Sequence, residues 1–181
     1  MAHRTLKNGS SYENLVDRLN RFPQGAPPSK TLYAILKMLF DEHEAEMVSL
    51  LPIKPFTAAK AAKAWHVSEK EARTLLDRLA GRAILLDISH DGESVYVLPP
   101  PMAGFFEFSM MRVRGDIDQK VLGQLFYQYM NVEEDFIKNL FTDGETQLGR
   151  VFVNEPALLQ DTSLYVLPYE RASEVMKTAS H

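Results

Sequence analysis

Four basic side chains along one predicted helix have the chemistry of contacts to DNA phosphates or to the carboxylates of a partner protein. They are Lys70, Arg73, Arg78 and Arg82. Acidic residues interrupt them, because Glu69, Glu71 and Asp77 lie in the same stretch. Residues 57–98 hold six bases and six acids, a net charge of zero. Since a DNA reader is normally basic at its contact helix, this pattern favours a protein partner, and DNA binding is the alternative.

A second candidate is an apolar segment after a run of three prolines. Its side chains are suited to lining an apolar pocket or a partner groove. The segment is too apolar for a solvated loop, so we expect a helix or turn over residues 102–112, buried in the core or in a dimer contact. The six residues of this candidate interface are Met102, Phe105, Phe106, Phe108, Met110 and Met111.

Catalytic and metal-binding patterns are absent from the sequence. His43 stands among acidic residues, but in a helix its neighbours three or four positions away include only one of them, Glu46, so we expect a solvated first turn. The five histidines show no HExxH spacing, and no GxGxxG, P-loop or GxSxG fingerprint occurs. With no cysteine, this chain holds neither a disulfide nor a thiolate ligand. We assign it no catalytic, cofactor or metal residue, and we expect no enzyme activity from it.

The elements that position the basic residues lie between Thr57 and Leu98. Thr57 is a plausible N-cap for a helix to Trp65, and Ser68 forms a capping box with Glu71 for the next helix. Gly81 ends that helix, and apolar, β-branched runs at 83–89 and 94–98 predict a hairpin around the turn 90–93. Helix, turn, helix and hairpin is the order of a winged helix, which contains a helix-turn-helix.

The flanking segments add further helices. We predict helices over 12–20, after Ser29, and from 41 to 51, with a proline-rich loop at 21–28 between the first two. The helix after Ser29 would be the first of the winged helix. The fold class is therefore α+β, mostly helical, with a winged-helix core and additional C-terminal helices. The expected domains are an N-terminal extension with a short helix (1–28), a winged-helix domain (29–100) and a helical portion packing on it (101–181).

The C-terminal portion carries its own signals. Asp116 is the expected cap of one helix, and Asn131 with Glu134 forms an apparent capping box for another. Strands are predicted at 150–154 and 163–167, and an amphipathic helix at 169–180. Because the chain ends on that helix, we expect it to be a fragment truncated before a further module.

Composition limits the class of protein. The chain has 181 residues, 45% hydrophobic, with net charge -4. It has no apolar run long enough for a bilayer and no signal-peptide core, so a cytoplasmic location is expected and a membrane partner is not. Residues 101–181 hold seven bases and twelve acids, an acidic balance that argues further against nucleic acid.

Three segments resemble a known family: RFPQGAPPS at 21–29, LPIKPFT at 51–57 and YERASE at 169–174. The chain is similar over residues 12–181 to the N-terminal region of bacterial 4Fe-4S ferredoxin-type proteins. This resemblance implies a winged-helix-like segment ahead of a cysteine-rich module whose 4Fe-4S clusters carry electrons. No cluster ligand can be assigned here, since this chain has no cysteine. The leading hypothesis is a non-catalytic winged-helix module used for partner docking or homodimerisation; the alternative is a DNA-binding transcriptional regulator.

Overall fold

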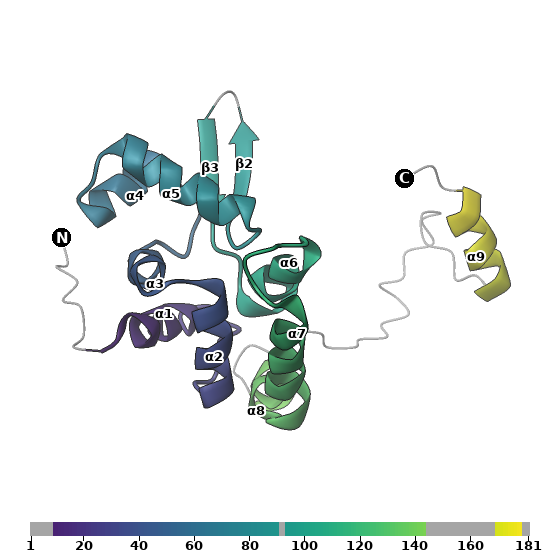
Figure 1. Ribbon diagram of the computed structural model, residues 1–181. Helices are drawn as coiled ribbons and strands as arrows, with labels where there is room; N and C mark the ends of the chain where they lie inside the picture. Colours follow the sequence, from purple (N-terminus) through teal and green to yellow (C-terminus); the bar gives the residue numbers. More distant parts are fainter. Residues whose placement is uncertain (1–8, 91–92, 144–168, 179–181) are drawn as a thin grey trace, which may run out of the picture. The chain divides into compact units, whose positions relative to one another are not determined.

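The computed structural model describes residues 9–90, 93–143 and 169–178. The chain divides into two compact units, residues 1–149 and residues 150–181. The first unit contains helices α1 to α8 and a three-stranded antiparallel sheet, and the second contains helix α9 (Figure 1). The mostly helical α+β class predicted from the sequence is confirmed.

Three capped helices open the first unit: α1 (Ser11–Leu19), α2 (Lys30–Leu39) and α3 (Glu42–Ser49). Their N-caps are Ser10, Ser29 and Asp41, and each cap side chain accepts a backbone N–H of the first turn. Helix α1 packs on α3. Between them the Arg18 side chain is fully buried, and it donates to the carbonyl oxygens of Leu51 (3.0 Å) and Pro52 (2.6 Å). The helix of the predicted N-terminal extension thus shares one compact unit with residues 29–100.

The next segment carries the sheet and two further helices. Thr57 and Ser68 cap α4 and α5 as predicted, and both helices end at the predicted residues. The sheet order is β1-β3-β2, with Phe56 opposite Tyr96. The bounds are β1 (Phe56–Thr57), α4 (Ala58–Trp65), α5 (Glu69–Gly81), β2 (Leu86–His90) and β3 (Glu93–Val97).

The hairpin differs from its prediction at both ends, since His90 and Glu93 of the predicted turn are paired strand residues and the second strand ends at Val97 and not at residue 98. The first strand was expected from residue 83, but Ala83 has φ 56 and the strand begins at Leu86. The left-handed turn places Ile84 and Leu85 in the core. Strand β1 was not predicted, because its two residues follow a proline-rich link. Residues 91 and 92 of the predicted turn lie outside the described residues.

An aromatic cluster holds the C-terminal helices of this unit together. The Phe106 ring centroid lies 5.0 Å from that of Phe126 and 5.9 Å from that of Phe136. The Tyr129 hydroxyl donates to the Pro27 carbonyl at 2.8 Å. The elements are η1 (Pro101–Phe105), α6 (Phe106–Met111), α7 (Gln119–Tyr127), η2 (Gln128–Val132), α8 (Asp135–Lys138) and η3 (Asn139–Asp143). Residues 101–143 thus belong to the same unit as the sheet.

Two predicted caps in this region are wrong. Asp118, and not Asp116, caps α7, and Asp116 instead pairs with Arg114. The Asn131–Glu134 capping box does not form: the Asn131 amide donates back to the Tyr127 carbonyl at 3.3 Å. The reason is that α7 continues into η2, so Asn131 lies inside helical turns and not at a helix start.

Helix α9 (Tyr169–Thr178) is the described part of the second unit. Its apolar side chains are largely exposed, with Tyr169 at 82% and Met176 at 73%. The strands predicted at 150–154 and 163–167 lie outside the described residues, as do residues 179–180 of the predicted last helix. In the described ranges, each helix is too short or too polar to cross a bilayer.

Candidate functional site

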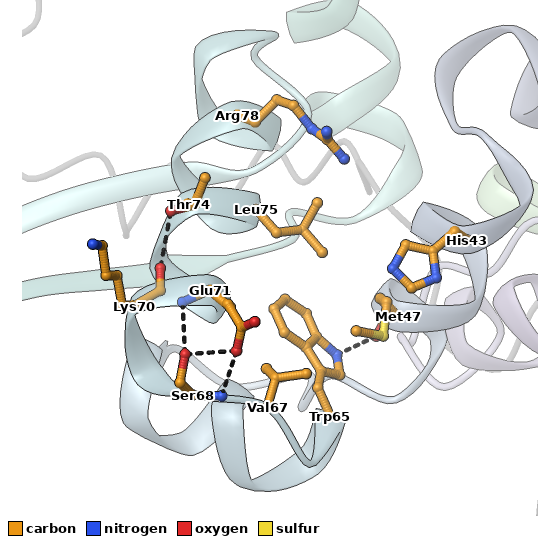
Figure 2. A pocket seen from close by; sticks show the side chains of 10 residues that line it. All are labelled: His43, Met47, Trp65, Val67, Ser68, Lys70, Glu71, Thr74, Leu75 and Arg78. Atoms are coloured by element: carbon orange, nitrogen blue, oxygen red, sulfur yellow. Dashed lines mark hydrogen bonds between the residues drawn. The ribbon is translucent and has the colours of Figure 1, made fainter.

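A hollow of about 710 Å³ opens between α3, the turn after α4 and the outer face of α5. Figure 2 shows the side chains of Leu75, Val67 and Met47 around the ring of Trp65, whereas the Lys70 side chain extends away from it. Its volume lies within the range of ligand and side-chain pockets. The residues that line it are His43, Met47, Trp65, Val67, Ser68, Lys70, Glu71, Thr74, Leu75 and Arg78.

The floor of the hollow is apolar. Trp65, the last residue of α4, is 6% exposed, and its indole Nε1 donates to the Met47 carbonyl at 2.7 Å. His66 follows in the left-handed conformation, with φ 56, so the chain turns sharply between α4 and α5. This turn brings Val67 over the floor, where it packs with Leu75 against the core. The floor is therefore held on two helices and a defined turn.

One end of the rim is the N-terminus of α5. Oε2 of Glu71 accepts from the Ser68 backbone N–H at 2.9 Å and from its hydroxyl at 2.6 Å. These hydrogen bonds lower the pKa of Glu71 below its ordinary value. Lys70 beside it is exposed, and no carboxylate of the described residues lies within ion-pair distance of its ammonium group. This end of the rim therefore carries one cation, Lys70, and one ionised carboxylate, Glu71, which is engaged in the helix cap.

The other end of the rim is an ion-pair cluster around Glu44, which is 2% exposed. Its Oε1 lies 2.9 Å from Nη2 of Arg78 and 2.7 Å from Nη2 of Arg82. Its Oε2 accepts the Asp41 backbone N–H at 3.2 Å. One carboxylate thus serves two guanidinium groups, and the cluster keeps a net positive charge.

The structure separates the four basic residues predicted to contact a partner or DNA. Arg73 pairs with Glu69 at 3.4 Å on the exposed face of α5. Arg78 and Arg82 come together on Glu44, and only Lys70 and Arg78 line the hollow. The four therefore do not form one continuous basic surface.

The six residues of the predicted apolar interface also divide. Phe105 and Phe106 are buried in the aromatic cluster, so they stabilise the core. Met102 and Phe108 are half-buried. Of the six, only Met110 and Met111 at the end of α6 are exposed, at 37% and 75%.

Sequence reasoning missed two features of the site. For Glu44, the sequence pattern indicates no more than a place in the first turn of the helix predicted from residue 41. Its spacing of three from Asp41 is a capping-box signal, which the structure bears out, but nothing local indicates its pairing with α5. The hollow itself was not predicted, because the sequence pattern indicates that both Trp65 and Leu75 belong to the core.

His43 lies on the rim of the hollow and is exposed, as expected for a solvated first turn. In the part of the chain that the structure describes, no three His, Cys, Asp or Glu side chains are grouped so that they could hold a metal ion. The side chains around the hollow supply apolar surface and positively charged groups, which are suited to binding a ligand or a partner protein.

Neither a protein-family model, nor a curated protein, nor a solved structure matches this chain.

Proposed function

We propose that this chain is a non-catalytic winged-helix module that docks a protein partner, as part of an iron-sulfur electron-transfer protein of the ferredoxin type. The order α3, β1, α4, α5, β2, β3 and the sheet order β1-β3-β2 support the winged-helix interpretation. In this assignment α5 is the helix that would face a ligand, and the β2–β3 hairpin is the wing. The first helix is then α3, in place of the helix capped by Ser29.

The observation that carries the docking function is the pairing of the arginines on α5 and of Arg82, the residue that follows it. Affinity for DNA comes largely from cations that are available to phosphates. Here Arg78 and Arg82 both bind the buried carboxylate of Glu44, and Arg73 pairs with Glu69. A helix whose arginines are paired within the protein is better suited to a protein surface, where apolar contact supplies the free energy.

Sedimentation equilibrium and a DNA titration together test this function. We expect no salt-sensitive binding to a labelled random-sequence duplex at low salt, because so few cations on α5 are unpaired. Homodimerisation is the form of docking that needs no second protein, and the exposed Met111 at the end of α6 is its best candidate contact. A concentration-dependent dimer that Met111→Glu abolishes would identify that form.

The iron-sulfur part of the proposal rests on the resemblance of the segments 21–29, 51–57 and 169–174. Reading the gene past the codon for His181 tests it directly. We expect cysteine codons at CxxC spacing, and a product of that gene with iron and visible absorption. A stop codon immediately after His181 would contradict this part and leave the docking part in place.

A DNA-binding regulator is the second candidate. The observation in its favour is that Lys70, Arg73 and Thr74 are exposed side by side on α5, the helix that enters the groove in proteins of this type. A gel-shift titration against genomic fragments at low salt decides between the two. Specific, salt-dependent binding that Lys70→Gln and Arg73→Gln both weaken would establish this candidate and overturn the first.

A further inference from the structure

We infer that the hollow between α3 and α5 is the docking site of this module, and that its occupant is a partner-protein segment combining apolar side chains with carboxylates. The inference rests on the proposed docking function and names the site and the chemistry of the partner. It comes from three features of the described residues: an apolar floor, a rim whose uncompensated charge is positive, and a rigid frame.

The floor selects for apolar side chains. Met47, Val67 and Leu75 pack against the core but remain partly exposed toward the hollow, around the buried ring of Trp65. Covering such a surface removes apolar area from water, which is the main favourable term in protein association. A volume of about 710 Å³ accommodates the side chains of a short segment and not a whole domain.

The rim selects for carboxylates. Two cations and one carboxylate line the hollow, and the carboxylate of Glu71 stays ionised because its hydrogen bonds to Ser68 lower its pKa. Lys70 is exposed, and Arg78 shares a single oxygen of Glu44 with Arg82 while remaining 56% exposed. Lys70 and Glu71 balance in formal charge at the start of α5, whereas Arg78 and Arg82 exceed Glu44 by one positive charge, so the excess charge is positive at the Arg78 end of the hollow. Guanidinium and ammonium groups at such a rim pair with carboxylates and steer an acidic segment toward the site.

The frame of the hollow is already fixed. The indole of Trp65 is held by Met47, the turn at His66 is capped onto α4, and Ser68 caps α5. Pre-formed sites lose little conformational entropy on binding. This arrangement is poorly suited to DNA, because a phosphate backbone makes no favourable contact with an apolar floor recessed below the rim. A protein segment uses both the floor and the rim.

The test is a selection from a random peptide library displayed on phage, with the full chain as bait. We expect an enriched consensus of aromatic or aliphatic residues flanked by Asp or Glu. A synthetic peptide of that consensus should alter the emission of Trp65, which is the single tryptophan of the chain and lies at the hollow. Peptide binding elsewhere would leave this emission unchanged.

Three substitutions make the test specific to the site. Lys70→Glu and Thr74→Glu place a carboxylate on the rim at exposed positions, so neither disturbs the core. We expect each to weaken the peptide by about tenfold or more through like-charge repulsion. Lys120→Glu on α7 is the matched control, because it makes the same charge change as Lys70→Glu at an exposed position outside the hollow. It should leave the affinity within about twofold.

The outcomes separate the inference from the function on which it rests. Peptides that bind without a Trp65 response, or equally well to Lys70→Glu and Lys120→Glu, would overturn the hollow as the site and leave the docking function standing. A basic consensus would overturn the proposed chemistry of the partner. If no peptide is enriched, the inference is overturned, and the docking function then rests on the dimer at Met111. If low-salt DNA binding is specific and is lost in Lys70→Glu, both the inference and the docking function are overturned.

Discussion

Nη2 of Arg82 lies 2.7 Å from Oε1 of Glu44, and Glu44 is 2% exposed. A carboxylate removed from water in this way remains charged only when opposite charge and hydrogen bonds replace its hydration. The pair joins α3 to the residue that follows α5, two elements far apart in the sequence.

Glu44→Gln should lower the free energy of unfolding by about 2–3 kcal/mol, because it leaves the largely buried Arg82 guanidinium, whose side chain is 22% exposed, without its counter-charge. Urea denaturation followed by the emission of Trp65 measures this. Glu46→Gln is the matched control, since Glu46 is exposed on the same helix and should change stability by less than about 0.5 kcal/mol. Equal effects of the two substitutions would show that the buried pair contributes nothing.

The two arginines on Glu44 should differ in importance. Arg82 has a side chain 22% exposed and Arg78 one 56% exposed, so water screens the pair with Arg78 more strongly. We expect Arg78→Gln to cost no more than about 1 kcal/mol and Arg82→Gln to cost more than that. A double-mutant cycle with Glu44→Gln measures the coupling of each pair. A larger coupling for Arg78 would contradict this ranking.

His66→Gly should stabilise the protein by about 0.5–1 kcal/mol, although it removes a side chain. His66 has φ 56 at the end of α4, a conformation that glycine adopts without steric cost. Ala64→Gly, inside the same helix, should instead destabilise by about 1 kcal/mol. Thermal unfolding of the two variants should therefore shift in opposite directions, and a shift in the same direction would contradict the strain at His66.

Stability should fall at alkaline pH because four tyrosines titrate late in the folded state. Burial raises the pKa of Tyr12, Tyr33, Tyr96 and Tyr129 above the ordinary value of 10.0, and nearby carboxylates such as Asp77 beside Tyr96 add to the shift. The unfolded chain therefore loses these protons first. The stabilisation is fully present below pH 10 and is lost as pH rises toward the folded pKa values.

Absorbance of phenolate during an alkaline titration, run beside urea denaturation at each pH, measures this effect. Tyr129→Phe should reduce the alkaline loss and cost about 1 kcal/mol at neutral pH, since it removes the hydrogen bond to the Pro27 carbonyl. Tyr127→Phe is the control, because Tyr127 is 64% exposed. Identical pH profiles for both variants would exclude Tyr129 as a source of the effect.

The local signals in the sequence predicted the helices well where neighbours in the chain decide the structure. Thr57 and the pair Ser68 and Glu71 cap their helices as expected, because these bonds span only three residues. The same reasoning failed at Asn131 and Glu134. Packing of the Phe106, Phe126 and Phe136 rings lets α7 run on into η2, so the helical turns continue past the local start signal.

The sequence by itself determined the caps of α2, α4 and α5 and the α+β class, since these follow from hydrogen bonds and periodicity within a few residues. Only the tertiary structure decided which charges meet. Glu44 and Arg82 lie far apart in the chain, and the packing of α3 near α5 makes one a partner of the other. The same packing leaves the ring of Trp65 beneath an open hollow. The turn at His66 sets the direction of α5 relative to α4, and no local sequence pattern predicts that direction.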